Sequence, residues 1–132
     1  MASIIDKVAW ILRKEDKILC ARSNGKDLFY LPGGKREPGE TDEETLAREI
    51  LEEISVHILP ETIIPMGAFE AEAHGKAHGT PVRMTCYEAD YTGELKPDAE
   101  IAELAWLGYQ DRERVSAVCQ LVFDALHERG QL

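Results

Sequence analysis

The chain has 132 residues, 44% of them hydrophobic and 30% charged, so we expect a single globular domain over residues 1–132 with a core of its own. Its formal net charge of -10 argues against binding to duplex nucleic acid, which requires clustered lysine and arginine. No apolar run reaches the roughly 20 residues that cross a bilayer, and the N-terminus lacks a signal-peptide pattern, so we expect a cytoplasmic protein without a membrane partner.

The three cysteines do not suggest a metal or redox site. Cys20, Cys86 and Cys119 are widely spaced and form no CxxC pair or zinc-ligand pattern. An odd number of cysteines also argues against a disulfide framework. We expect buried thiols in a reducing compartment.

The N-terminal residues have the pattern of short strands joined by turns. Residues 7–21 predict two strands with a turn at Lys14 to Lys17, and both faces of the first strand are apolar, as in a strand covered on two sides. Residues 29–31 predict a further short strand that leads into a glycine loop. Trp10, in the first strand, is a candidate to stack on a substrate base, with a core position as the alternative.

The glycine loop begins after Pro32. Gly33 and Gly34 permit positive φ and let the backbone approach a ligand that a side chain would block. Lys35 places a cation directly beside that backbone. The loop therefore has the composition of an anion-binding segment.

A helix is predicted to begin near Asp42, because Thr41 and Glu44 have the spacing of a capping box. At about 100° per residue, its core-facing arc is aliphatic and contains Leu46, Ala47, Ile50, Leu51 and Ile54. A second arc is acidic and contains Glu49, Glu52 and Glu53. Because these carboxylates repel one another, the arc is either a solvated acidic face or a site for a hard cation such as Mg2+ or Mn2+.

The segment from Gly34 to Val56 resembles the Nudix box, G-x5-E-x7-R-E-U-x-E-E-x-G-U, where U is aliphatic. The matching positions are Gly34, Glu40, Arg48, Glu49, Ile50, Glu52, Glu53 and Val56. The one departure is Ser55, which stands where the family has glycine. A left-handed residue at a helix end costs about 1 kcal/mol or more when it is not glycine, so Ser55 bears on the helix end and not on the carboxylates.

The resemblance implies a Mg2+ site, with Mn2+ as the alternative ion. Its expected ligands are the backbone of Gly33 and the side chains of Glu40, Glu49, Glu52 and Glu53. Arg48 is expected to hold one glutamate by a charge-assisted hydrogen bond, and Glu40 either joins the metal through water or braces the loop. Gly34 and Lys35 are expected to contact substrate phosphate.

Strands are predicted over residues 56–59, 63–73 and 82–91, with Pro60 and Pro65 interrupting the first two. Between the last two lies a polar loop, His74 to Pro81. Its histidines would have metal-ligand spacing only in a helix, and two glycines argue against one. We expect an exposed hairpin loop that can form a lip over the substrate.

Two carboxylates flank the start of a predicted strand that ends near Leu107. The pattern E-I-x-E-x-x-W from Glu100 to Trp106 resembles the region in which Nudix proteins carry an additional carboxylate that binds metal or activates water. We favour Glu100 over Glu103 for this role, with a strand-edge charge as the alternative. The general base stays open among Glu49, Glu52 and Glu100.

Apolar residues at helical spacing from Val115 to Leu126 predict a final helix that ends before Gly130. Two helices with strands between and around them imply an α/β fold with a mixed β-sheet covered on both sides. The resemblance implies the same architecture, the Nudix-type α/β/α sandwich.

The resemblance implies hydrolysis of a diphosphate linkage in a nucleoside diphosphate derivative. Residues 40–53 hold seven carboxylates against one arginine, so a phosphorylated substrate requires metal ions to neutralise the cleft. The compact length and the GGKxExGE run resemble MutT-like members of the family, and this resemblance implies action on nucleoside triphosphates, including oxidised ones. ADP-ribose, other NDP conjugates, dinucleoside polyphosphates, a catalytically inactive nucleotide-binding module and an interaction domain are the alternatives, and the chain is expected to be a monomer or homodimer.

Overall fold

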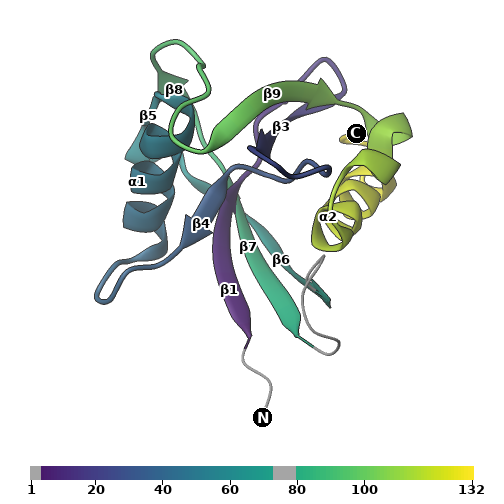
Figure 1. The fold of residues 1–132 in the computed structure, drawn as a ribbon, viewed down its shortest axis with the longest axis horizontal. Coiled ribbons are helices and arrows are strands. Elements are labelled where there is room, and N and C mark those ends of the chain that lie inside the picture. Colours follow the sequence, from purple (N-terminus) through teal and green to yellow (C-terminus); the bar gives the residue numbers. More distant parts are fainter. Residues whose placement is uncertain (1–3, 73–79) are drawn as a thin grey trace.

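The computed structural model describes residues 4–72 and 80–132. A four-stranded sheet lies between two helices, α1 (Asp42–Ile54) and α2 (Ala117–Glu128), which occupy opposite sides of Figure 1. The strand order is β4 (Gly33–Lys35), β1 (Ile5–Trp10), β7 (Pro81–Glu88) and β6 (Ile64–Glu72). Strands β1 and β7 are parallel and the other two pairs are antiparallel, so the predicted mixed sheet between helices is confirmed.

The remaining strands form two smaller sheets. One has the order β2 (Arg13–Lys14), β3 (Lys17–Ser23) and β9 (Ile101–Leu107), and the other pairs β5 (His57–Ile58) with β8 (Tyr91–Thr92). Short 3-10 helices are η1 (Pro60–Thr62) and η2 (Tyr109–Arg114). The predicted turn at Lys14 to Lys17 joins β2 to β3 through Glu15 and Asp16, which both have left-handed backbone conformations.

Two strand predictions are wrong in detail. Residues 29–31 form no strand, because Tyr30 makes only an isolated bridge with Ala21 and Phe29 only one with Val115, and regular pairing with β1 starts at Gly33. Pro65 does not interrupt its strand, since β6 lies at the sheet edge, where a missing N–H is tolerated and the register shifts past the proline.

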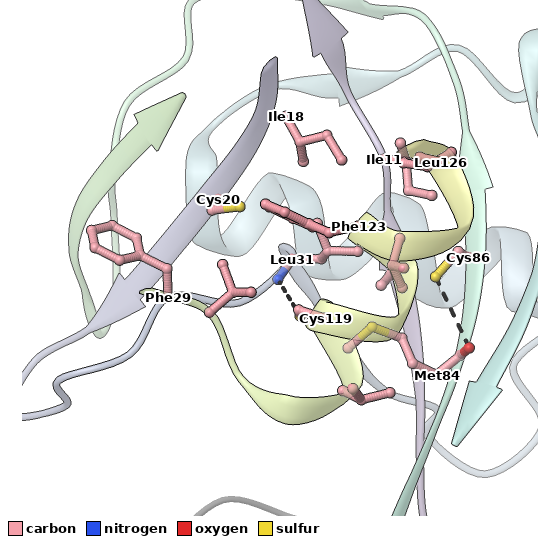
Figure 2. Packing of buried hydrophobic residues seen from close by; sticks show 14 of the residues in the cluster. Ile11, Ile18, Cys20, Phe29, Leu31, Met84, Cys86, Cys119, Phe123 and Leu126 are labelled. Atoms are coloured by element: carbon pink, nitrogen blue, oxygen red, sulfur yellow. Dashed lines mark hydrogen bonds between the residues drawn. The ribbon is translucent and has the colours of Figure 1, made fainter. Parts of the chain in front are cut away.

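The sheet separates two apolar clusters, as the two-sided pattern of β1 predicted. Val8 and Trp10 pack on the α1 side, whereas Ala9 and Ile11 pack on the α2 side. Figure 2 shows the second cluster, in which Phe123 and other α2 side chains lie over the sheet. All three cysteines are free and buried there, as predicted, and Cys119 Sγ accepts a hydrogen bond from the Leu31 N–H at 3.3 Å (Figure 2).

Helix α2 begins at Ala117, two residues after the predicted start, and its last residue is Glu128. Among residues 4–72 and 80–132, we find no helix with the length and apolar content that a membrane crossing needs.

Candidate functional site

The glycine loop packs against the backbone of β1 and against the acidic helix α1. Gly33 has a φ of 149°, and a Cβ atom there would collide with the carbonyl oxygen of Val8. A Cβ atom on Gly34 would collide with the carboxylate of Glu49. Gly33 therefore requires glycine, because its neighbour is backbone that cannot move aside, whereas at Gly34 a side chain would have to displace the Glu49 carboxylate that lies against the loop.

The N-terminal end of α1 has the capping box that the sequence predicts, and its C-terminal end is left-handed despite the serine. The Thr41 hydroxyl accepts a hydrogen bond from the Glu44 N–H at 3.1 Å, and the Glu44 carboxylate accepts one from the Thr41 N–H at 2.9 Å, which completes the capping box. At the other end, Ser55 is left-handed, with a φ of 69°. The helix thus ends as a glycine would end it, with serine in the strained conformation.

Arg48 ties the loop before α1 to the helix. Its guanidinium donates to both carboxylate oxygens of Glu40 at 2.6 and 2.8 Å and to Glu49 Oε1 at 2.8 Å. It also donates to the carbonyl oxygen of Lys35 at 3.0 Å. The predicted charge-assisted hydrogen bond is present, and it restrains two glutamates instead of one.

The carboxylate of Glu40 has partners on both oxygens. Besides Arg48, it accepts from the Glu37 N–H at 2.8 Å and from the Thr45 hydroxyl at 2.9 Å. The Arg48 guanidinium, followed by these two groups, lowers the pKa of Glu40 to about 2. This geometry supports the bracing role for Glu40, and its role as a metal ligand stays a prediction.

Glu53 is a buried charge beside the glycine loop. Glu53 is only 7% exposed, and its Oε1 accepts a hydrogen bond from the Gly33 N–H at 2.9 Å. Burial raises the pKa of Glu53 to about 7, and the nearby charges of Glu49 and Glu100 raise it further, against the Gly33 hydrogen bond and Lys7. The carboxylate therefore lies where a positive charge would stabilise it.

Glu49 and Glu100 belong to the same electrostatic cluster. Burial raises the pKa of Glu49, and Glu52 and Glu100 add to the shift, although Arg48 opposes it. Glu100 precedes β9, whereas Glu103 forms an ion pair with Arg22 at 3.0 Å. The structure thus places Glu100, and not Glu103, within the field of the helix carboxylates.

The donor set suits a hard divalent cation. Within residues 4–72 and 80–132, no three acidic, histidine or cysteine side chains are already arranged as metal ligands. Arg48 bonds Oε1 of Glu49, and the Gly33 N–H bonds Oε1 of Glu53. The donors that approach one another are all carboxylate oxygens, and burial and mutual repulsion disfavour their charged forms. Oxygen donors with unrelieved negative charge fit Mg2+ or Mn2+.

Trp10 is not available to a substrate base. It is 0% exposed, its indole N–H donates to the Ala89 carbonyl at 3.2 Å, and its ring meets Tyr91 edge to face in the α1-side cluster. The candidate role in substrate binding is therefore corrected to a core role. In the predicted loop from His74 to Pro81, both histidines lie outside the described residues.

Two residues near the carboxylates were not among the predicted site residues. Burial and the charges of Glu53 and Glu100 raise the pKa of Tyr30 to about 12. Lys7, in β1, carries a positive charge that opposes the rise of the Glu53 pKa caused by burial. The only sequence signal for Lys7 is its alternation with Val8 in β1, which predicts that the two side chains lie on opposite faces.

The family follows from a comparison with known proteins. The model of the NUDIX domain matches residues 6–118. The chain belongs to the Nudix hydrolase family. This confirms the resemblance carried by Gly34 to Val56 and the Nudix-type fold.

Curated relatives include the human 8-oxo-dGDP phosphatase NUDT18, 34% identical over 106 residues that make up 75% of this chain and 30% of that protein. An uncharacterized Nudix hydrolase YvcI of Bacillus subtilis (strain 168) is 25% identical over 101 residues, 76% of this chain and 64% of that protein. The chain thus spans less than two thirds of the length of either relative.

Solved structures agree on the fold. The E. coli ORF135 protein has a TM-score of 0.76 at 24% identity, covering 96% of this chain and 91% of that one. A MutT protein from Methanosarcina mazei Go1 has a TM-score of 0.75 at 22% identity, covering 99% and 98%.

Proposed function

We propose that residues 1–132 form one domain that hydrolyses a phosphoric anhydride bond in a nucleoside diphosphate derivative, with Mg2+ or Mn2+ as cofactor. The observation that carries the proposal is the buried carboxylate of Glu53 against the Gly33 N–H, within the field of Glu49 and Glu100. A structural protein gains nothing from holding such charges together, whereas a metal-dependent hydrolase needs them. Family membership supports the same reaction class.

The metal would be held by Glu49, Glu52 and Glu53, with the Gly33 carbonyl as a further ligand. When bound, Mg2+ supplies Lewis-acid chemistry and offsets the charge of the phosphates. In Glu49 and in Glu53 only Oε1 accepts these hydrogen bonds, from Arg48 and from the Gly33 N–H, so the second oxygen of each carboxylate would be the one to bind the ion.

The other residues of the site have positioning roles. Arg48 orients Glu49 and is itself fixed by Glu40, so the loop and the helix carry the acidic groups as one unit. Gly34 has no side chain, which lets the Glu49 carboxylate lie against the loop, and its backbone is proposed to contact phosphate beside that carboxylate. A carboxylate of the cluster, with Glu100 among the candidates, accepts a proton from the attacking water as its oxygen bonds to phosphorus and the anhydride P–O bond breaks.

The substrate is proposed to be a nucleoside triphosphate, including oxidised forms. The MutT-like size and the similarity to a protein named as an 8-oxo-dGDP phosphatase support a panel that starts with oxidised and normal nucleoside tri- and diphosphates. ADP-ribose, NDP-sugars and dinucleoside polyphosphates complete it. Release of pyrophosphate with a monophosphate identifies triphosphate hydrolysis, and release of orthophosphate identifies a terminal cleavage.

The panel is assayed with Mg2+, with Mn2+ and after thorough chelation by EDTA. We expect turnover of at least one compound with a divalent ion and none without it. Activity that survives chelation would contradict the metal role. Tight nucleotide binding without any product across the panel would instead support a binding module that has lost catalysis.

A further inference from the structure

A row of four residues crosses the central sheet next to the glycine loop. Lys7 of β1 is paired with Lys35 of β4 on one side and with Met84 of β7 on the other, and Met84 is paired with Phe69 of β6. Directly paired residues project from the same face of a sheet. Because Met84 and Phe69 pack in the α2-side cluster, the two lysines also belong to that face.

This arrangement places two lysine residues directly opposite each other across β1 and β4. Like charges directly opposite one another are destabilising. Within residues 4–72 and 80–132, neither Lys7 nor Lys35 has a hydrogen bond or ion pair from its ammonium group to a carboxylate. The row therefore carries a local positive charge that the fold does not neutralise.

The arginines around the site differ from these lysines in this respect. Arg36 bridges Asp6 at 3.0 Å and Asp42 at 2.5 Å, and Arg48 is occupied by Glu40 and Glu49. Their charges are already paired within the protein. The two lysines are thus the cations of the described part of the site whose charges are not paired with a carboxylate.

The lysines also lie close to the carboxylate site. Lys35 follows the two glycines, and its carbonyl oxygen accepts a hydrogen bond from Arg48 at 3.0 Å. Lys7 is half-buried and lies two residues before Ala9, which pairs with Gly33, the residue whose N–H donates to Glu53. Burial raises the pKa of both Glu53, on α1, and Cys119, on α2, and the charge of Lys7 opposes both shifts.

We propose that Lys7 is a substrate-binding residue, which together with Lys35 holds the non-bridging oxygens of a polyphosphate chain next to the carboxylate site. An ammonium group binds phosphate oxygens by charge-assisted hydrogen bonds, and a polyanion relieves the repulsion between the two lysines. The inference rests on the proposed function for the choice of a phosphate ligand, and it adds a contact residue outside the Nudix box.

The test measures binding separately from turnover. Isothermal titration calorimetry with inorganic pyrophosphate and with ADP, each in the presence of Mg2+, is carried out on wild type, Lys7→Met and Lys7→Arg. One lost charge-assisted hydrogen bond corresponds to roughly ten-fold weaker binding or more. We expect that loss in Lys7→Met and a smaller one in Lys7→Arg.

Lys17→Met is the matched control, because Lys17 is exposed and lies in the β2–β3 hairpin. It should bind pyrophosphate as wild type does. Lys7→Gln serves in place of Lys7→Met if the methionine variant does not give a wild-type circular dichroism spectrum.

The outcomes separate this inference from the proposed function. If Lys7 variants bind pyrophosphate and ADP as wild type does, or if wild type binds neither, the inference is overturned even when the enzyme turns over a nucleotide. If wild type binds through Lys7 but hydrolyses nothing, the inference holds and the proposed function fails. With a substrate in hand, Lys7→Met should raise KM more than it lowers kcat.

Discussion

The replacement Glu53→Gln should separate what the buried charge does for stability from what it does for function. Glutamine has nearly the same shape, and its carbonyl oxygen can still accept the hydrogen bond from the Gly33 N–H. The change removes the negative charge from a residue that is 7% exposed. Among the residues that the structure describes, no lysine, arginine or histidine forms an ion pair with that charge in the metal-free protein.

The magnitude follows from the pKa, which burial and like charges raise from 4.5 to about 7. This difference corresponds to about 3 kcal/mol. Because the folded-state pKa is the higher one, the stability contribution is complete below pH 4.5 and is lost as the pH rises through 7. Burying the glutamine amide offsets about 1–2 kcal/mol of the gain, which leaves the variant about 1–2 kcal/mol more stable at pH 8.

The assay is thermal unfolding in EDTA at pH 8 and at pH 4.5. We expect the variant to melt roughly 4–7 °C above wild type at pH 8 and below wild type at pH 4.5, where the wild-type carboxyl is protonated. Glu52→Gln is the control, because Glu52 has a 56% exposed side chain, and its stability should change by less than about 0.5 kcal/mol.

The same variant tests the metal site. Saturating Mg2+ should stabilise wild type more than Glu53→Gln, and turnover of the variant should fall by roughly a hundred-fold or more. If the variant is no more stable than wild type at pH 8 in EDTA, the account of the buried charge is wrong. If it keeps wild-type turnover with Mg2+, the assignment of Glu53 to the metal site is wrong.

Three further changes test single features of the fold. Ser55→Gly should raise the free energy of unfolding by about 1 kcal/mol in urea titrations, because glycine adopts the left-handed helix end without strain, whereas Ser55→Ala should not; equal values would contradict the strain at Ser55. Asp124→Asn should destabilise the protein at neutral pH, since the Arg112 guanidinium lowers the pKa of Asp124. The loss of unfolding free energy should disappear as pH falls below 3.8, where the wild-type carboxyl becomes protonated, and a loss that persists there would refute the ion-pair origin. Trp10→Phe should cost about 2 kcal/mol through a cavity and the lost hydrogen bond to Ala89 while KM stays within two-fold, and a large rise in KM would restore a substrate role.

The features that sequence could predict are those set by local spacing. The capping box depends on Thr41 and Glu44, three positions apart, and it is present. The sequence identified Ser55 as the irregular position at the helix end but did not predict its left-handed conformation. The pairing of Arg48 with glutamates follows from the helix and the loop that precedes it. These elements lie within one continuous segment, so their geometry is largely encoded there.

The features that sequence could not predict depend on pairing between distant strands. Lys7 and Lys35 are 28 positions apart, and only the register of β1 with β4 brings them to one face. Trp10 lies in a strand that is apolar on both sides, so alternation alone does not tell which face turns toward a ligand. The short bridge at Tyr30 likewise depends on Ala21, in another element.

The charges of the site are segregated in a way that connects the metal and the phosphate proposals. Arg48 forms ion pairs with Glu40 and Glu49, so it fixes the positions of these carboxylates and its own charge is already compensated. The negative charge that remains, at Glu53, is buried against the loop backbone, and the positive charge that remains, at Lys7, is on the sheet face nearby. A metal ion would compensate the charge of Glu53, and a polyphosphate would compensate the charge of Lys7. The metal ion and the polyphosphate also attract each other, so the binding of either one should increase the affinity of the protein for the other.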